Sequence, residues 1–431
     1  MKRLLFLFAS FALLAGCNGN KPEDNPPVDD ALTVSFPSPT AQLTKVDLNA
    51  TERGYVDAGD RMAFRFLSQL YDGKNLILSP LSLQYALAMT ANGASGQTLQ
   101  EIIGFLGYGN EGLQVLNAFS KKMLEQLPAV DLDVTLKLTD AILVSNDYPL
   151  HSDFKKTVEE NYYAAVANMD FSDPAKVAKS VNDWASKNTA GFLDKVLNPD
   201  DISPQTVALL MNALYFKARW AGGESDPMFD EYNTSKDAFT LADNTKTQVD
   251  YMRTSRQLRY AEMDGYRVLE LPYADGKFNM YVLLPDKNDL ASLVNKLPDV
   301  SWSKVLSSMK DDAQVDLRLP KFDMENKYDL TEHMKALGIK KAFSGAAEFD
   351  RMFQASDYGA TFHIGKVIQK AKISVAEWGT EAAAVTVVVM DKYAVPFEGK
   401  RIKFYADHPF IFLIGEASSG AILFEGAYAG K

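Results

Sequence analysis

Residues 377–390 have the sequence Glu-Trp-Gly-Thr-Glu-Ala-Ala-Ala-Val-Thr-Val-Val-Val-Met, and no other stretch indicates the fold as strongly. Successive side chains of a β-strand point to opposite faces, so a strand that begins at Thr380 has two distinct faces. One face contains only small or uncharged residues: Thr380, Ala382, Ala384, Thr386, Val388 and Met390. The charged Glu381 and Asp391 lie on the other face. The segment can therefore enter the middle of a sheet without burying a charge.

The residues that follow have a different character. Residues 391–403 contain Pro396, Gly399 and four cationic side chains, which is typical of an exposed loop. An Ala- and Val-rich run alone more often indicates an ordinary buried strand. A strand-like segment that leads into an exposed loop is the less common arrangement, and it predicts a segment that moves into a sheet.

Composition limits the class of protein. The chain has 431 residues, 47% apolar and 23% charged, which predicts a globular protein with a large core. Its formal net charge is −11 and it has no basic cluster, so we expect no nucleic-acid partner. No linker-like stretch divides the central part of the chain, and we expect one domain over residues 51–431.

The N-terminal residues predict export and lipidation. Met1-Lys-Arg precedes an apolar run from Leu4 to Leu14, and the sequence Leu14-Ala-Gly-Cys17 resembles a bacterial lipobox. The run is too short for a permanent membrane span. We expect residues 1–16 to be a lipoprotein signal peptide and Cys17, the only cysteine, to carry the lipid. Residues 17–50 then form a disordered tether in the bacterial cell envelope, at the outer membrane on its periplasmic or surface face. The alternative is a plain secretory signal with an incidental cysteine.

Helical patterns dominate the first half and strand patterns the second, which predicts an α+β fold. The expected helices are 55–70, 81–92, 96–106, 113–126, 151–163, 174–190, 289–297 and 327–337. The expected strands are 134–145, 206–216, 248–260, 267–272, 278–284, 362–390 and 401–427.

Short motifs along residues 55–429 occur in the order found in the serpin family. They are Asn75-Leu-Ile-Leu-Ser-Pro-Leu-Ser82, Ala86-Leu-Ala-Met89, Val181-Asn-Asp-Trp184, Asn212-Ala-Leu-Tyr-Phe216 with Trp220, Glu270-Leu-Pro-Tyr273, Leu319-Pro-Lys-Phe322, Ala406-Asp-His-Pro-Phe410 and Leu423-Phe-Glu-Gly426. The hinge sequence Glu-x-Gly-Thr-Glu-Ala-Ala-Ala also matches, with Trp378 as the unusual member. The chain therefore resembles an inhibitory serpin of the bacterial lipoprotein type.

The resemblance implies a serpin fold, with an N-terminal helical region, a large central β-sheet, further sheets and an exposed reactive loop. It implies a serine protease inhibitor rather than an enzyme, in which loop cleavage is followed by insertion of the hinge segment into the central sheet and covalent trapping of the acyl-protease. The implied hinge is Glu377, Gly379, Thr380, Glu381, Ala382, Ala383 and Ala384. The implied sheet-opening region includes Ser79, Pro80, Ser82, Asn212, Gln369 and Trp220.

Two features depart from the family pattern. Gln369 stands where serpins commonly have a histidine, and the segment after the hinge is longer than in many serpins. Counting sixteen residues on from Glu377 places the reactive bond at Tyr393–Ala394, which favours chymotrypsin-like or subtilisin-like targets. A shift by one residue gives Lys392 and a trypsin-like target, whereas Met390 or Val389 would suit elastases.

Other functions are less well supported by the sequence. The alternative is a non-inhibitory serpin that acts as a surface binding or carrier lipoprotein. The expected partners are serine proteases, some cysteine proteases and the membrane through the lipid, and we expect a monomer. His151, His333, His363 and His408 lack metal-ligand spacing, so we expect no metal and no cofactor. Residues 107–112 match Gly-x-Gly-x-x-Gly but follow a helix, which predicts a turn rather than a dinucleotide site.

Overall fold

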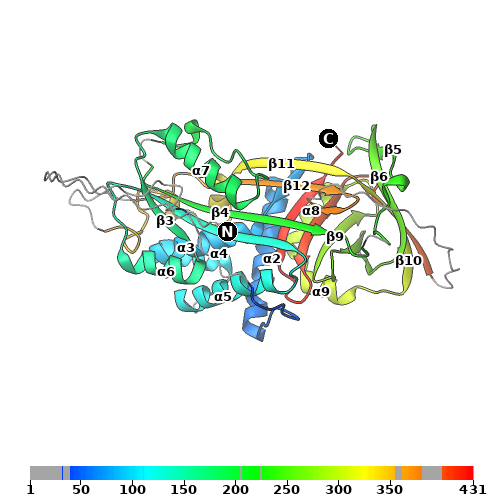
Figure 1. The fold of residues 1–431 in the computed structure, drawn as a ribbon, viewed down its shortest axis with the longest axis horizontal. Helices are drawn as coiled ribbons and strands as arrows, with labels where there is room; N and C mark the ends of the chain where they lie inside the picture. The colour runs from blue at the N-terminus through cyan, green and yellow to red at the C-terminus, as the bar shows by residue number, and fades with distance from the viewer. Residues whose placement is uncertain are drawn as a thin grey trace, which may run out of the picture.

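The computed structural model describes residues 32, 39–109, 111–203, 206–223, 226–354, 362–380 and 400–430. The α-helices are α2 (Ala50–Leu70), α3 (Pro80–Gly93), α4 (Gly96–Leu106), α5 (Leu113–Gln126), α6 (Ser152–Tyr162), α7 (Pro174–Asn188), α8 (Leu290–Lys296), α9 (Trp302–Ser308) and α10 (Thr331–Ala336). Short 3₁₀ turns are η1 (Leu127–Ala129), η2 (Pro199–Asp201), η3 (Glu231–Asn233), η4 (Leu297–Asp299) and η5 (Lys341–Phe343). The expected α+β class is confirmed (Figure 1).

The strands form three sheets. They are β1 (Leu76–Leu78), β2 (Thr135–Ser145), β3 (Ala165–Met169), β4 (Ala208–Arg219), β5 (Ser235–Thr240), β6 (Lys246–Gln257), β7 (Tyr260–Met263), β8 (Tyr266–Pro272), β9 (Phe278–Pro285), β10 (Ala313–Pro320), β11 (Phe322–Asp329), β12 (Ile368–Ala376), β13 (Gly379–Thr380), β14 (Lys400–Tyr405), β15 (Phe410–Glu416) and β16 (Ile422–Tyr428). The sheet orders are β11-β12-β13-β4-β2-β3, β1-β16-β15-β9-β8-β7 and β14-β10-β6-β5. The first of these is called the central sheet below.

Local sequence explains where the first helices begin. The side chain of Asn49 accepts from the backbone of Glu52, and Glu52 bonds back to Asn49, so α2 begins with a complete capping box. Ser79 caps α3 and Pro80 occupies its first turn, where proline needs no backbone hydrogen bond. This cap fixes the start of α3 beneath the central sheet.

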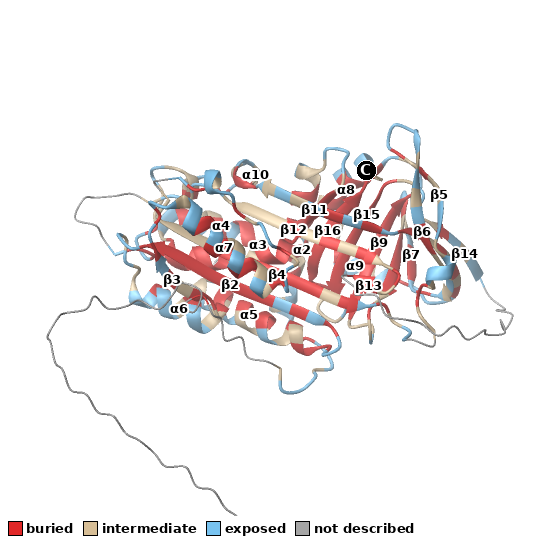
Figure 2. Cartoon of the chain, turned by 45° about the horizontal axis from the view of Figure 1, so that its top comes forward, coloured by how far each residue is buried: buried red, intermediate tan, exposed pale blue. Residues whose placement is uncertain are grey.

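The central sheet packs on both faces. Leu136, Leu138 and Ile142 of β2 belong to the main core with α2, α3 and α5. Ala141 and Leu143, which alternate with them, belong to a second cluster with α7. The period of two along the strand therefore places helices on both sides of the sheet (Figure 1). Strands β9, β15 and β16 are buried along their whole length (Figure 2).

The structure corrects several expected elements. A helix was expected over residues 327–337, but residues 327–329 belong to β11 and α10 begins only at Thr331. The polar residues of β11 have no strong strand pattern, and its full-length pairing with β12 decides their conformation. The expected strand 248–260 is divided between β6 and β7. Within the expected strand 362–390, residues 362–367 belong to no strand, and the first strand, β12, begins at Ile368.

Residues 39–49 pack against the folded body, although the sequence placed them in the tether. The backbone N–H of Leu43 donates to the carbonyl of Ala129 at 2.7 Å, and that of Val46 donates to Ser418 Oγ at 2.9 Å. Val46 is fully buried, and Leu32 is buried in the cluster that contains α7. The folded unit therefore begins before residue 51. None of the described helices combines the length and the apolar character that crossing a bilayer requires.

Candidate functional site

The hinge lies between two strands of the central sheet. Gly379 pairs with both Ala376 of β12 and Arg219 of β4, and Thr380 pairs with Val375 and Ala218. The two-residue strand β13 is antiparallel to both neighbours. Away from β13, the described residues of β4 and β12 form no ladder of backbone hydrogen bonds with each other. The hinge residues Gly379 and Thr380 are therefore already inserted, at the end of an opening in the sheet.

Glycine is required at the entrance of this opening. Gly379 has φ +140°, a conformation that L side chains rarely adopt. A Cβ atom there would lie 2.0 Å from the carbonyl oxygen of Ala218 on β4. The close approach of the two backbones explains why the hinge has glycine at this position.

Thr380 is buried, with 3% of its surface exposed. Its hydroxyl lies 2.5 Å from the phenol oxygen of Tyr273. Burial raises the pKa of Tyr273 above its usual value, so the phenol is neutral. The Tyr273 ring stacks on Trp220 with ring centroids 4.4 Å apart. The pocket that receives Thr380 is thus compact, aromatic and uncharged.

Glu377 anchors the turn that leads into β13. It is only 4% exposed, and its carboxylate accepts from Lys321 Nζ at 2.9 Å and Thr234 Oγ1 at 2.8 Å. Burial alone would raise the pKa of Glu377, but the hydrogen bonds from Lys321, from its own backbone N–H and from Thr234 hold it below its ordinary value. A charged, hydrogen-bonded carboxylate therefore fixes the start of the hinge.

The two tryptophans of this region hold the same turn. Trp378 Nε1 donates to Glu231 at 2.7 Å, which gives this unusual hinge residue a structural role. Trp220 donates from its backbone to the Trp378 carbonyl at 3.2 Å and from Nε1 to the Ala376 carbonyl at 2.8 Å. Trp220, grouped by sequence with the sheet-opening region, therefore belongs with the hinge.

The other predicted sheet-opening residues lie further along the same opening. Gln369 of β12 accepts from the backbone N–H of Ser79 at 3.1 Å and donates to its carbonyl at 2.7 Å. Ser79 Oγ donates to the Leu423 carbonyl at 3.0 Å and lies 3.0 Å from Ser82 Oγ. Gln369 thus links β12 to the start of α3 and to the strand beneath it.

Asn212 belongs to the opposite side of the opening. It lies on β4 and donates to Asp140 of β2 at 2.7 Å. Gly379 pairs with Arg219 of β4 on one side and with Ala376 of β12 on the other. Asn212 lies seven residues before Arg219, and Gln369 lies seven residues before Ala376, so the two amides occupy the same level of the opening. Asn212 is bonded within its own half of the sheet, whereas Gln369 is bonded to the start of α3. Tyr273 and Lys321 lie in two of the family motifs, but sequence reasoning gave no role to them or to Asp140, because their partners are distant in the chain.

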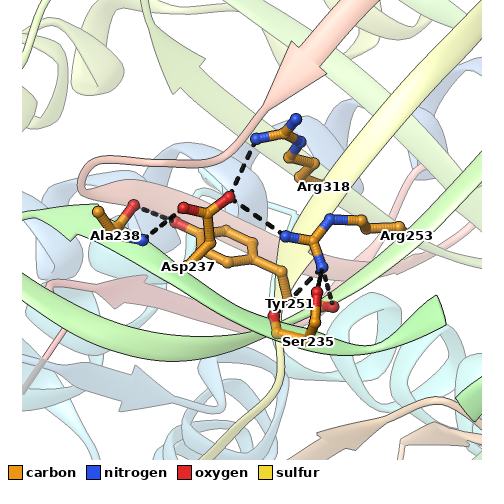
Figure 3. A network of polar contacts seen from close by, with 6 residues as sticks. All are labelled: Ser235, Asp237, Ala238, Tyr251, Arg253 and Arg318. Atoms are coloured by element: carbon orange, nitrogen blue, oxygen red, sulfur yellow. Dashed lines mark hydrogen bonds and ion pairs between the residues drawn. The ribbon is translucent and has the colours of Figure 1, made fainter. Parts of the chain in front are cut away.

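The four-stranded sheet holds the chain where it returns from the loop. Strand β14 begins at Lys400 and runs parallel to β10. Asp237 Oδ2 accepts from Arg253 and from Arg318, each at 3.2 Å (Figure 3). The Ala238 backbone N–H, followed by the two guanidinium groups, holds the pKa of Asp237 below its ordinary value. Arg318 also lies over the Tyr405 ring, 4.1 Å from its centroid, and this network braces β14.

Several predicted residues lie outside the described part of the chain. They are Glu381, Ala382, Ala383, Ala384, Met390, Lys392, Tyr393, Ala394 and Cys17. The described residues on either side, Thr380 and Lys400, are each held in a different sheet. The loop that would carry the reactive bond is therefore fixed at both ends.

The glycine motif at residues 107–112 and His408, which suggested no site in the sequence, have structural roles. Gly107 ends α4 in the left-handed conformation and Gly112 precedes α5, so the glycine motif connects two helices, as predicted. Both ring nitrogens of His408 have partners, Asp407 and the Pro285 carbonyl. Within the described ranges, no three His, Cys, Asp or Glu side chains form a metal-binding group.

Comparisons with known proteins agree with this geometry. Residues 57–430 match the model of the family described as Serpin (serine protease inhibitor). The chain is 31% identical to Serpin-ZX of Arabidopsis thaliana over 85% of this chain and 94% of that protein. It is 30% identical to an uncharacterized serpin-like protein of Thermococcus kodakarensis over 99% and 98%.

Solved structures show the same fold. The thermophilic serpin tengpin in its native state superposes with a TM-score of 0.80 at 26% identity, covering 94% of this chain and 99% of tengpin. A complex of thyroxine-binding globulin with thyroxine superposes with a TM-score of 0.76 at 25% identity, covering 87% and 98%. The sequence motifs, the three sheets and the family match together show that the chain belongs to the serpin family.

Proposed function

We propose that this protein inhibits serine proteases, and some cysteine proteases, as a suicide substrate. The observation that carries this proposal is β13, because its two residues, Gly379 and Thr380, lie between β12 and β4. A protease that cleaves the exposed loop would free its N-terminal part to continue this strand. Completion of insertion would then trap the acylated protease before the ester is hydrolysed.

The observed register indicates how the rest of the hinge would fit. Continued from Gly379 and Thr380, it brings Thr386 to the level of Asn212 and Gln369. Thr386 is on the same face as Thr380 and would meet these two amides with a small hydroxyl. Alanine residues occupy the same face between them, so insertion would bury no charge along this length.

A carrier function is the alternative. The similarity to thyroxine-binding globulin shows that the fold also occurs in a complex with a small molecule. Small-molecule binding does not by itself call for a hinge with one face of small, uncharged residues. The glycine at 379, the buried Thr380 and the small residues after them therefore favour inhibition.

The inhibitor proposal is tested by incubating residues 18–431 with chymotrypsin-like, trypsin-like, elastase-like and subtilisin-like proteases. We expect a complex stable to heat and detergent with a chymotrypsin- or subtilisin-like enzyme, and a released C-terminal fragment that starts at Ala394. A stable complex with a fragment that starts at Tyr393 would move the reactive bond to Lys392. Loop cleavage without any stable complex would instead favour the carrier function.

We further propose that the protein is exported and anchored through Cys17. The lipobox-like sequence before Cys17 supports this proposal, and a tether before residue 32 would leave the inhibitor free to meet proteases near the envelope. Metabolic labelling with a radioactive fatty acid should mark the wild-type chain in a bacterial host. The Cys17→Ser variant should lose the label and leave the membrane fraction, and a labelled variant would contradict the assignment.

A further inference from the structure

Two carboxyl groups are buried where helix α2 packs on strand β16. Asp60 of α2 is buried, and Glu425 of β16 has no exposed surface. Asp60 Oδ1 accepts from the backbone N–H of Ile422, three residues before Glu425, at 3.2 Å. The two carboxyl groups lie within electrostatic reach of each other. Two acidic side chains, which are rarely buried without a partner, therefore share one small region of the core.

The carboxyl group of Glu425 has an apolar environment. Neither of its oxygens has a hydrogen-bond partner among the described residues. Its neighbours across the sheet are Leu78 of β1 and Leu413 of β15. A charged carboxylate in these surroundings would cost far more free energy than a neutral acid, because nothing replaces the water that it loses. The fold therefore favours the neutral form of Glu425.

Glu416 on the adjacent strand β15 shows the contrasting case of a buried glutamate with partners. Its carboxylate is also fully buried, but it accepts from the backbone N–H and the hydroxyl of both Ser418 and Ser419, at distances between 2.6 and 2.9 Å. Four donors are the environment of a charged carboxylate. The same sheet thus surrounds one buried glutamate with donors and gives the other none.

The surroundings of Asp60 supply little positive charge. The charged groups that act on it are Asp57 and the exposed Arg61 of its own helix, and their effects oppose each other. The phenols of Tyr85 in α3 and Tyr108 after α4 line the same cavity as Asp60, and burial raises the pKa of both, so they are neutral. In the described part of the chain, Asp60 therefore has no ion pair that would offset its burial.

Burial determines the protonation of both acids. It raises the pKa of Asp60 well above its ordinary value, and the bond from Ile422 offsets this effect only in part. Burial also raises the pKa of Glu425 well above its ordinary value, and the nearby charge of Asp60 adds to the increase. Both carboxyl groups are therefore protonated in the native fold under mildly acidic conditions, in which the acids of an unfolded chain are ionised.

We propose that Asp60 and Glu425 form a pH-sensitive contact between α2 and β16, which is stable while both acids are protonated and is weakened when they ionise. Ionisation would leave two like charges buried at one contact between a helix and a strand. Separation of α2 from β16 would admit water and hydrate these charges. The native fold is therefore most stable in acidic surroundings and loses stability as the pH rises. This pH dependence is a property of the fold and does not depend on the proposed inhibition.

The direction of the pH dependence follows from proton binding in the two states. Both acids bind protons more tightly in the native fold than in the unfolded chain, where the pKa values are 3.8 for Asp60 and 4.5 for Glu425. Above these values unfolding releases protons, so a rising pH favours the unfolded state until the native pKa values are passed. In this range each acid changes the unfolding equilibrium constant by about tenfold per pH unit, and the two together change it by about a hundredfold.

The test compares the loop-intact wild-type protein with Asp60→Asn, Glu425→Gln and the double variant, in which neutral amides of the same shape replace the acids. Urea unfolding at pH 5.5 and pH 6.5 gives the unfolding equilibrium constant at each pH. We expect each single replacement to reduce the increase over this pH unit by about tenfold, and the double replacement by about a hundredfold. Other buried acids, such as Asp140, remain in all four proteins and cancel in the comparison.

The matched control is Glu416→Gln, which replaces a buried glutamate that has four donors on the neighbouring strand. This variant should be less stable than wild type at both pH values, and its pH dependence should equal that of wild type. If Glu425→Gln does not fold, Glu425→Met supplies an apolar side chain of similar length for the same comparison. A wild-type pH dependence in either Asp60→Asn or the Glu425 variant would overturn the proposed contact.

Discussion

Replacing Thr380 by arginine is expected to convert the protein from an inhibitor into a substrate of the same protease. Thr380 is 3% exposed between β4 and β12, and its hydroxyl meets the neutral phenol of Tyr273. A guanidinium group has no anionic partner in this aromatic pocket, so insertion would bury an unpaired charge. A penalty of about 3 kcal/mol slows a step about a hundredfold, and an unpaired buried charge costs at least this much. Hydrolysis of the acyl-enzyme would then be completed before insertion.

The measurement for Thr380→Arg is the fraction of inhibitor that ends in the stable complex rather than as cleaved product. The matched control is Thr380→Ser, which retains a small hydroxyl for Tyr273 and should inhibit almost as wild type. Tryptophan fluorescence provides a second readout, because expulsion of β13 would release the contacts of Trp220 and Trp378 with the hinge. Covalent complexes formed by Thr380→Arg at the wild-type rate would contradict the insertion mechanism.

Replacing Gln369 by methionine is expected to destabilise the native fold by about 2–4 kcal/mol, since two polar groups lose their partners. The groups are the backbone N–H and carbonyl of Ser79, which is only 4% exposed. Methionine has a similar volume but offers no comparable hydrogen bond, so packing changes little. The link between β12 and the start of α3 would be lost.

Urea unfolding of the loop-intact protein measures this effect as a lower midpoint with an unchanged slope. The control is Gln97→Met, because Gln97 is exposed on α4 and its amide donates only to the side chain of Glu101. A midpoint equal to that of wild type would show that the Gln369 bonds contribute nothing net to the native state. Gln369 has no titratable group, so the destabilisation should be the same at pH 6 and pH 8.

The contacts of the native hinge determine how the proposed inhibition would begin. Glu377, Gly379 and Thr380 are already fixed by Lys321, by the backbone of β4 and by Tyr273. The first step of insertion therefore requires no search by a free chain. Further insertion would continue β13 between β4 and β12 to the level of Asn212 and Gln369. The contacts that hold the hinge are thus separate from those of Asn212 and Gln369.

The sequence by itself determined the family, the α+β class and the chemistry of the hinge. These properties depend on local order: the alternation of small residues from Thr380, the glycine at 379 and the caps at Asn49 and Ser79. A strand with one uncharged face is recognisable from its period of two alone. The helices at 96–106 and 113–126 were predicted with the observed bounds, because their apolar residues recur at helical spacing.

Only the tertiary structure decided which side chains meet at the hinge and in the opening. The motifs that contain Tyr273 and Lys321 do not reveal their partners, and Asp140 lies in no such motif. Each of the three acquires its role from a residue more than fifty positions away. Strand β11 likewise depends on pairing with β12 rather than on its own polar sequence. Burial and long-range hydrogen bonding fix protonation states and strand partners, and neither quantity exists until distant segments are packed together.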